Sequence, residues 1–239
     1  MQSIITYENL RDFCYCNDAL ICGDIRGVIV QFMGLGNMEM HAEDPERGRA
    51  LAEKGIALLI PYNNPWNWMN AQAVAFTDAL LDALWARHQL ADGLPVVCVG
   101  GSMGGLCALV YTRYAKRVPT ACVVNCPVCD LPYHYTERPD LPRTLYSAFA
   151  ASGAATLDEA LRAHSPLHLA AELPDIPYVI FHCEADTLVN IHRHSDRFVE
   201  AMRGRRQVAY IRVPGRDHCD LGEAAQAEYE RRAEAAILR

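Results

Sequence analysis

The sequence has no apolar run of the ~18 residues that a membrane-spanning helix needs, and its first residues lack the basic and apolar segments of a secretory leader. Lysine is also scarce, since Lys54 and Lys116 are the only lysines among 22 basic residues, and the arginines form no stripe. With a net charge of -7, the chain is not expected to bind nucleic acid. We therefore expect a soluble cytoplasmic protein without a membrane partner.

Disulfides and metal are not expected either, although the chain has 10 cysteines. Most of them lie in apolar segments, where a free thiol behaves as a small hydrophobic side chain. Cys14 and Cys16, and likewise Cys126 and Cys129, are close enough to share a metal ion. No second pair with zinc-finger spacing accompanies them, so the sequence predicts reduced thiols and no metal or cofactor.

Six continuous apolar runs dominate the sequence: 27–33, 55–62, 94–101, 120–127, 176–186 and 208–215. Apolar runs without alternation are typical of strands buried on both faces, as in parallel sheets. Two weaker runs, 3–8 and 11–18, are predicted to add antiparallel strands at an edge.

Helical patterns lie between the runs. Residues 71–88 carry apolar side chains at helical spacing, and residues 104–116 are rich in Ala, Leu and Tyr. At the C-terminus, Asp220 followed by Glu223 predicts a capping box that opens a last helix. The alternation predicts one α/β domain over residues 1–239, a doubly wound, mostly parallel sheet with helices on both faces. Residues 127–174, which contain no clear strand, are expected to form a small cap-like insertion over its carboxyl edge.

Gly100, Ser102 and Gly104 form a G-x-S-x-G pattern between a predicted strand and a predicted helix. A sharp strand-to-helix turn strains the residue at its apex, and glycines two positions away leave room for the neighbouring elements. The hydroxyl would then project above the sheet. In the alternative interpretation the serine only caps the next helix. The segment matches neither G-x-x-x-x-G-K nor G-x-G-x-x-G, which disfavours nucleotide binding.

This pattern in its context resembles the α/β-hydrolase family over nearly the whole chain. The family's chain order is nucleophile, acid, histidine. The segment FHCEADTLV resembles the family's H-G-x-x-D-x-x-V pattern, and VPGRDHCDLG follows the last predicted strand. The resemblance implies a triad of Ser102, Asp186 and His218, in which Asp186 orients the histidine.

Other acids and histidines lie close by: Glu184, Asp217, Asp220, His182, His192 and His194. Glu184 should point the other way on an extended chain. Asp217 and Asp220 are too near His218 in sequence to reach around its ring easily. The three histidines are expected to be packing or surface residues.

The resemblance also implies two amides that stabilise an oxyanion. Met103 N–H would lie at a helix N-terminus, where free amides and the helix dipole favour an anion. The second donor would come from the loop after the first long strand, where Met33 replaces the family's frequent histidine before Gly34. Leu35 N–H is the predicted donor there, and Gly36 N–H is the alternative.

Substrate-binding residues are predicted at the same edge of the sheet. Trp66 and Trp68 follow a predicted strand and could form a pocket wall, or could instead anchor their loop to the core. Tyr133, in the insertion, could close the site from above, although aromatic residues in a cap also form its own core.

The segment SPLHLAAELPDIPYVIFHCEADTLVNIHRHSDRF is similar to the catalytic domain of prolyl oligopeptidase-like enzymes, whose large peptidases carry a β-propeller for which this sequence is too short. The resemblance therefore implies a carboxylesterase-like serine hydrolase that cleaves small to medium carboxylic esters through an acyl-enzyme. Alternatives are an aminopeptidase- or dipeptidyl-peptidase-like hydrolase acting on short peptides, an acyltransferase, and a non-catalytic ligand-binding protein. A peptidase would need a group such as Glu39, Glu43 or Glu137 to bind the substrate terminus. A homo-oligomer is compatible with the sequence.

Overall fold

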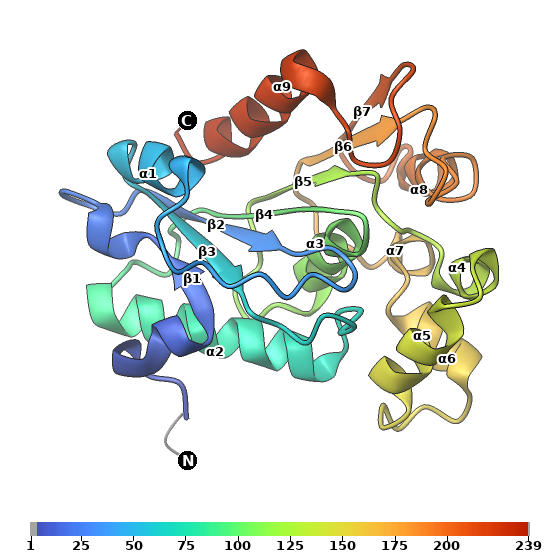
Figure 1. Ribbon diagram of the computed structural model, residues 1–239, viewed down its shortest axis with the longest axis horizontal. Coiled ribbons are helices and arrows are strands. Elements are labelled where there is room, and N and C mark those ends of the chain that lie inside the picture. Colours follow the sequence, from blue (N-terminus) through green and yellow to red (C-terminus); the bar gives the residue numbers. More distant parts are fainter. Residues whose placement is uncertain (1–3, 239) are drawn as a thin grey trace.

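The computed structural model describes residues 4–238 and contains a seven-stranded sheet with helices on both faces (Figure 1). The strands are β1 (Cys14–Cys16), β2 (Gly27–Phe32), β3 (Ile56–Pro61), β4 (Val96–Gly101), β5 (Ala121–Asn125), β6 (Tyr178–Cys183) and β7 (Val208–Val213). Their order across the sheet is β1-β3-β2-β4-β5-β6-β7. This confirms the predicted fold class, an α/β-hydrolase fold.

Every neighbouring pair of strands is parallel except β1 and β3, in which Cys14 pairs with Pro61. Strands β3 and β5 are buried along their whole length, as the continuous apolar runs predict. Strand β7 at the edge is only half-buried and carries Arg212. The parallel strands therefore end at one edge of the sheet, and the loops that follow them meet there.

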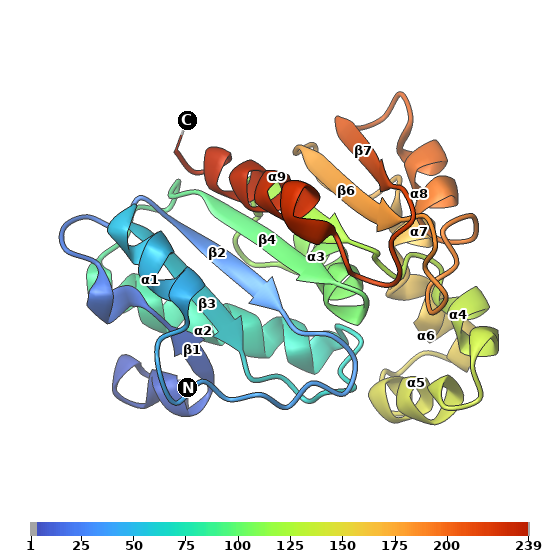
Figure 2. The same ribbon diagram turned by 45° about the horizontal axis from the view of Figure 1, so that its top comes forward.

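Two apolar cores lie on the two faces of the sheet. Helices α1 (Glu46–Glu53) and α9 (Gly222–Ala235) cover one face, and α2 (Ala71–His88), α3 (Met103–Tyr114) and α8 (Ser195–Met202) cover the other. Figure 2 shows α1 and α9 in front of the strands and α2 and α3 behind them. None of the helices among residues 4–238 has the length and apolarity to cross a membrane.

The ends of the chain differ from two predictions. Run 3–8 does not form a strand in its described part, because Tyr7–Asp12 forms the 3-10 helix η1, capped at Thr6; Ser3 lies outside the described residues. A second 3-10 helix, η2 (Asp18–Leu20), follows β1. The predicted capping box is also wrong: helix α9 has Leu221 at its N-cap, and Asp220 Oδ1 instead accepts a hydrogen bond from Gly222 N at 3.1 Å.

The segment between β5 and β6 contains only helices: α4 (Leu131–Glu137), α5 (Leu141–Phe149), α6 (Leu157–Ala163) and α7 (Pro166–Leu169). Figures 1 and 2 place α4, α5 and α6 together beyond the ends of the central strands. Apolar residues of these helices, including Leu145 and Leu161, belong to the same core as α2 and α3. The segment is thus packed onto the domain rather than joined to it by a flexible linker.

Candidate active site

Ser102 occupies the turn between β4 and α3, where its backbone has φ 57 and ψ -126. Such positive φ values strain any residue other than glycine. A Cβ atom at Gly100 would overlap the backbone of Gly104, and one at Gly104 would overlap the carbonyl oxygen of Phe32. The two glycines are therefore required by close backbone approach, and a hydrogen bond from Ser102 N to Asn125 O at 3.0 Å ties the turn to β5.

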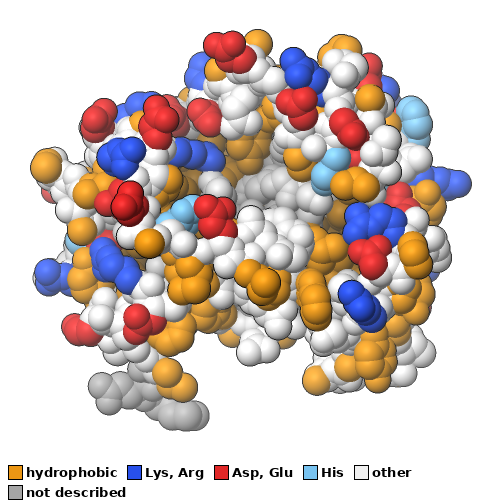
Figure 3. All heavy atoms as spheres, in the orientation of Figure 1, with side chains coloured by type: hydrophobic (Ala, Val, Ile, Leu, Met, Phe, Trp, Pro, Cys, Tyr) orange, Lys and Arg blue, Asp and Glu red, His pale blue; other side chains and the backbone are white. Residues whose placement is uncertain are grey.

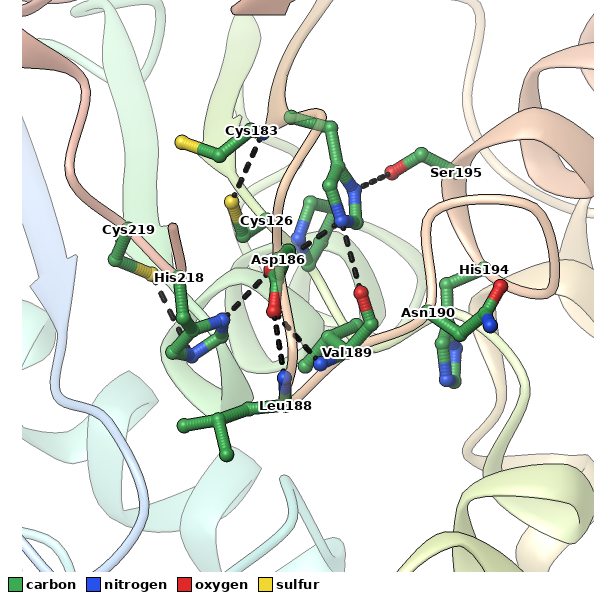
Figure 4. Close-up of polar contacts among 12 residues, drawn as sticks. Cys126, Cys183, Asp186, Leu188, Val189, Asn190, His194, Ser195, His218 and Cys219 are labelled. Atoms are coloured by element: carbon green, nitrogen blue, oxygen red, sulfur yellow. Dashed lines mark hydrogen bonds and ion pairs between the residues drawn. The ribbon is translucent and has the colours of Figure 1, made fainter. Parts of the chain in front are cut away.

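Asp186 and His218 follow β6 and β7, and the fold brings their side chains into contact. His218 Nδ1 lies 2.7 Å from Asp186 Oδ2 (Figure 4). Because an ionised carboxylate only accepts hydrogen bonds, Nδ1 carries the proton in this contact. The other nitrogen, Nε2, is then free to accept a proton when the ring is neutral.

The environment of Asp186 favours its ionised form. Its side chain is fully buried, yet Oδ1 accepts hydrogen bonds from the amides of Leu188 at 2.9 Å and Val189 at 2.8 Å. Burial opposes ionisation, but the hydrogen bonds from His182, His218 and Val189 outweigh it and hold the pKa of Asp186 far below its usual range. A permanent negative charge therefore faces the ring of His218.

That charge acts on His218 in turn. Burial lowers the pKa of His218, but the hydrogen bond and charge of Asp186 outweigh burial and raise the pKa above its ordinary value. The ring is 15% exposed and lines a cleft of about 650 Å³ that Ser102 and Cys219 also line. The face of the molecule in Figure 3 is hollowed near its centre.

The other nearby acids are engaged elsewhere. Glu184 pairs with Arg212 at 2.9 Å, and Asp220 pairs with Arg216 at 3.0 Å. Asp217 accepts bonds from the amides of Thr187 and His218, but it does not contact the imidazole ring in the described part of the chain.

The three other histidines in this region are engaged with other partners. His192 is exposed and pairs with Asp196, while His182 and His194 are fully buried and bonded at both ring nitrogens. The structure thus brings Asp186 to His218 and keeps the alternatives away from the ring.

The expected oxyanion donors border the site. Met103 is the first residue of α3, and amides in the first turn of a helix have no acceptor within the helix. Leu35 lines the Ser102 cleft together with Met33 and Gly34. Gly36 N–H, the alternative donor, is occupied, because it donates to Pro65 O at 2.9 Å.

The predicted substrate-binding residues do not all reach the cleft. Trp68 lines it, although the side chain is buried and its Nε1 donates to Thr144 Oγ1 at 3.1 Å. Trp66 is 41% exposed and lines a separate cavity of about 540 Å³. Tyr133 is not among the cleft residues, and its ring packs against His194, with a centroid separation of 5.7 Å.

Four further polar residues line the cleft. Glu39 and His41 come from the loop after β2, whereas His134 and Arg138 come from α4 and its C-terminal end. The Arg138 guanidinium is held by Asp140, with Nη2 to Oδ2 at 2.6 Å. Glu39 was a candidate for binding a peptide terminus, but His41 and Arg138 were not predicted from the sequence, because no motif marks either position.

His134, Glu137 and His194 form a buried network beside the cleft. Glu137 Oε2 lies 2.5 Å from His134 Nδ1 and 2.8 Å from His194 Nε2. Burial opposes the charge of Glu137, but the two imidazole hydrogen bonds lower its pKa to about 2. Burial lowers the pKa of His134, although the hydrogen bond and charge of Glu137 act in the other direction. Glu137 therefore binds its own chain rather than a ligand.

The cysteines group differently from the spacing in the sequence. The sulfurs of Cys126 and Cys219 lie within 4.8 Å of each other and of a ring nitrogen of His218. Cys219 Sγ is 3.7 Å from His218 Nε2 (Figure 4). Across the described residues, all 10 cysteines are free thiols.

No curated protein matches this chain. Among solved structures it is similar to the puromycin-hydrolyzing peptidase of Mycobacterium tuberculosis, with a TM-score of 0.66 and 19% identity over 90% of this chain and 34% of that chain. It is also similar to the esterase Est2 of Thermogutta terrifontis, with a TM-score of 0.67 and 20% identity over 99% of this chain and 91% of that chain.

A third similar structure is the acylaminoacyl peptidase of Pyrococcus horikoshii, with a TM-score of 0.67 and 13% identity over 87% of this chain and 36% of that chain. This chain thus spans about a third of the length of the two peptidases. At these identities the likeness is one of fold. The model of the prolyl oligopeptidase family matches residues 67–238, which include the Ser102 turn, Asp186 and His218, and the chain therefore belongs to this family of serine hydrolases.

Proposed function

We propose that the protein hydrolyses small to medium carboxylic esters, with Ser102 as nucleophile, His218 as general base and Asp186 as the residue that orients His218. The observation that carries the proposal is the 2.7 Å contact between His218 Nδ1 and Asp186 Oδ2 at a cleft that the strained Ser102 turn also lines. A serine hydroxyl becomes a good nucleophile when a positioned base removes its proton.

In the proposed mechanism, His218 Nε2 accepts the proton of Ser102 Oγ as the oxygen attacks the ester carbonyl. The amides of Met103 and Leu35 donate to the developing oxyanion, and each such donor contributes about 3 kcal/mol to lowering the barrier. The imidazolium then protonates the departing alkoxide, and an acyl-enzyme remains on Ser102. Water, deprotonated by the same His218, releases the acid.

Among the described residues, no hydrogen bond joins the side chains of Ser102 and His218; the nearest described partner of His218 Nε2 is Cys219 Sγ at 3.7 Å. Catalytic hydrogen bonds often tighten only when substrate is bound. The proposal therefore includes a small rotation of the Ser102 hydroxyl or the His218 ring when the ester enters the cleft.

The carboxylates in and beside the cleft favour an ester over a peptide. A peptidase that reads a substrate amino terminus needs a carboxylate that is partly shielded from water and free to pair. Glu137 is shielded, but it is already bonded to His134 and His194. Glu39 lines the cleft, but its side chain is 63% exposed, and exposed ion pairs contribute at most about 1 kcal/mol. Glu39 nevertheless makes an aminopeptidase-like activity the second candidate.

The test is labelling with a fluorophosphonate probe, with Ser102→Ala as the control, followed by turnover of p-nitrophenyl acetate and butyrate against aminoacyl and dipeptidyl anilides. We expect labelling that depends on Ser102 and faster turnover of the esters. A native protein that resists the probe would favour a ligand-binding role. Rapid anilide cleavage with negligible ester cleavage would reverse the order of the two candidates, and product analysis with added alcohol would reveal acyl transfer.

A further inference from the structure

Two thiols and one imidazole nitrogen converge beside the proposed catalytic residues. The ligand atoms of Cys126, His218 and Cys219 all lie within 4.8 Å of one another. Cys126 follows β5, whereas His218 and Cys219 follow β7, so the tertiary fold creates the cluster. In Figure 4 the sulfur of Cys219 lies next to the His218 ring, and Cys126 and Cys183 are drawn above that ring in the view.

In two neighbouring clusters of the same kind, the groups that meet are already bonded to one another or to other parts of the chain. In the group of Cys126, His182 and Asp186, His182 is bonded to Ser195 Oγ at 2.6 Å and to Val189 O at 3.1 Å. Both nitrogens of that ring are therefore used within the protein.

In the group of His134, Glu137 and His194, both nitrogens of His194 and one nitrogen of His134 are used within the protein. His194 Nδ1 accepts from the amides of Cys129 and Asp130, and both His194 Nε2 and His134 Nδ1 contact Glu137 Oε2. His218 Nε2, by contrast, contacts only the Cys219 sulfur, a weak hydrogen-bond partner, among the described residues.

We propose that Cys126, Cys219 and His218 Nε2 form a binding site for Zn²⁺ or another thiophilic divalent cation. Two thiolates and one imidazole, with a fourth position left to water, make up a known tetrahedral zinc site. In a tetrahedral zinc site with ideal bond lengths, the sulfur and nitrogen atoms that bind the metal lie about 3.6 Å apart. The separation between Cys219 Sγ and His218 Nε2 is 3.7 Å.

The surroundings of the three groups fit a metal ion. A histidine that binds a metal usually donates its other N–H to a carboxylate, and Asp186 receives that bond from His218 Nδ1. Asn125 Nδ2 donates to Cys219 O at 3.1 Å and so fixes the loop that carries two of the ligands. His218 and Cys219 line the cleft, which gives a cation a path from solvent and a place for its water ligand.

The consequence for activity depends on the proposed function. A cation on Nε2 occupies the lone pair that would accept the Ser102 proton, so the metal-bound protein cannot activate the nucleophile. The site would therefore act as a reversible off-switch, and hydrolysis would return when a chelator removes the ion.

Metal binding can be tested without reference to activity. The purified full-length chain is titrated with Zn²⁺ in a calorimeter, and with Co²⁺ in a spectrophotometer, where cobalt bound to thiolates absorbs in the near-ultraviolet. We expect one Zn²⁺ per chain, a thiolate-to-cobalt band, and loss of ester hydrolysis that EDTA reverses. The exposed cysteine supplies a matched control, because Cys22→Ser removes a thiol outside the cluster and should behave as the wild type.

Cys219→Ser should weaken Zn²⁺ binding by at least about tenfold, the lower bound for loss of a group that merely supports a ligand. The variant should also give a weaker cobalt band. Added Zn²⁺ should leave its rate of ester hydrolysis at the value measured without metal. Cys126→Ala, checked by circular dichroism for an intact fold, should weaken binding likewise. A cobalt complex without a thiolate band, or inhibition of Cys219→Ser at the wild-type Zn²⁺ concentration, would overturn the proposal.

Ser102→Ala separates this proposal from the proposed function. The variant should bind Zn²⁺ and give the cobalt band like the wild type, while it no longer hydrolyses esters. If it remained active, the assignment of the nucleophile would fail and the metal site would stand. If it and the wild type bound no Zn²⁺, the metal site would fail and the hydrolase assignment would stand.

Discussion

His182 Nε2 lies 3.4 Å from Asp186 Oδ2, so a second buried imidazole faces the carboxylate that contacts His218. Its Nε2–H also points to Val189 O at 3.1 Å, and its Nδ1 lies 2.6 Å from Ser195 Oγ. A carbonyl can only accept a hydrogen bond, so Nε2 carries a proton, and Nδ1 pairs with the Ser195 hydroxyl. His182 therefore links α8 to the loop that holds Asp186.

Replacing His182 by leucine should destabilise the protein by about 2 kcal/mol, because buried polar partners lose their hydrogen bonds. The effect of His182→Leu on kcat should be smaller than the effect of replacing Asp186. In the His182→Leu variant, Asp186 still accepts hydrogen bonds from the Leu188 and Val189 amides. Urea unfolding and ester turnover measure the two effects. The control is His192→Gln at an exposed ring. Equal stability of the His182→Leu variant and the wild type would contradict this role.

Asp186→Asn should lower kcat for a p-nitrophenyl ester by about three to four orders of magnitude. An asparagine can donate to His218 Nδ1, and the ring would then carry its proton on Nε2, where it cannot accept the Ser102 proton. The matched control is Glu184→Gln on the same loop, since Glu184 pairs with Arg212 on the surface and should leave kcat within a few-fold. Similar losses in both variants would refute the assignment of the acid.

The raised pKa of His218 predicts the acid side of the pH–rate profile. The ring must be neutral to accept a proton, so kcat/KM should fall as pH decreases through its pKa, with a midpoint above the ordinary imidazole value of 6.5. The folding stability should depend on pH in the direction opposite to that of kcat/KM. The favourable contact of protonated His218 with Asp186 contributes to stability at low pH and is lost as pH rises through the raised pKa of His218. A rate that does not change from acidic to alkaline pH would exclude a histidine base.

Gly104→Ala should destabilise the fold by about 3 kcal/mol and reduce fluorophosphonate labelling, because the new methyl group would overlap the carbonyl oxygen of Phe32. Gly93→Ala is the control: a Cβ atom there meets nothing within 4 Å. That variant should be as stable as the wild type or slightly more so. Denaturant unfolding gives both values, and an unchanged Gly104→Ala midpoint would show that the turn tolerates a side chain.

Glu137→Gln should destabilise the protein by about 2–3 kcal/mol at neutral pH, because a charged acceptor of two imidazole N–H groups is lost. The pKa of Glu137 is lowered from 4.5 to about 2, so its stabilisation is complete above 4.5 and is lost as pH falls toward 2. The variant should thus lose less stability than the wild type over that interval. Glu172→Gln, at an exposed pair with Arg113, should change stability by no more than about 0.5 kcal/mol.

Much of the architecture was predictable because its signals are local. A strand buried on both faces is a continuous apolar run, and α2 begins and ends at the predicted residues, Ala71 and His88. The prediction of a strand at residues 3–8 was wrong because Thr6 caps the 3-10 helix η1. The β-propensity of these residues does not reveal that a helix competes with the strand. The predicted capping box at Asp220 was also wrong, because the Asp220 carboxylate accepts a hydrogen bond from Gly222 N and the N-cap of α9 is Leu221, one residue later.

By itself, the sequence determined the order of strands and helices and the turn that exposes Ser102, because apolar periodicity and the glycines around the serine act over a few neighbouring residues. Tertiary structure alone decided that Trp68 rather than Trp66 lines the cleft, that Glu137 binds two histidines beside the cleft, and that Cys219 lies next to the His218 ring. These contacts join residues far apart in the chain. Their distances depend on how the loops after different strands pack at one edge of the sheet, which no local pattern encodes.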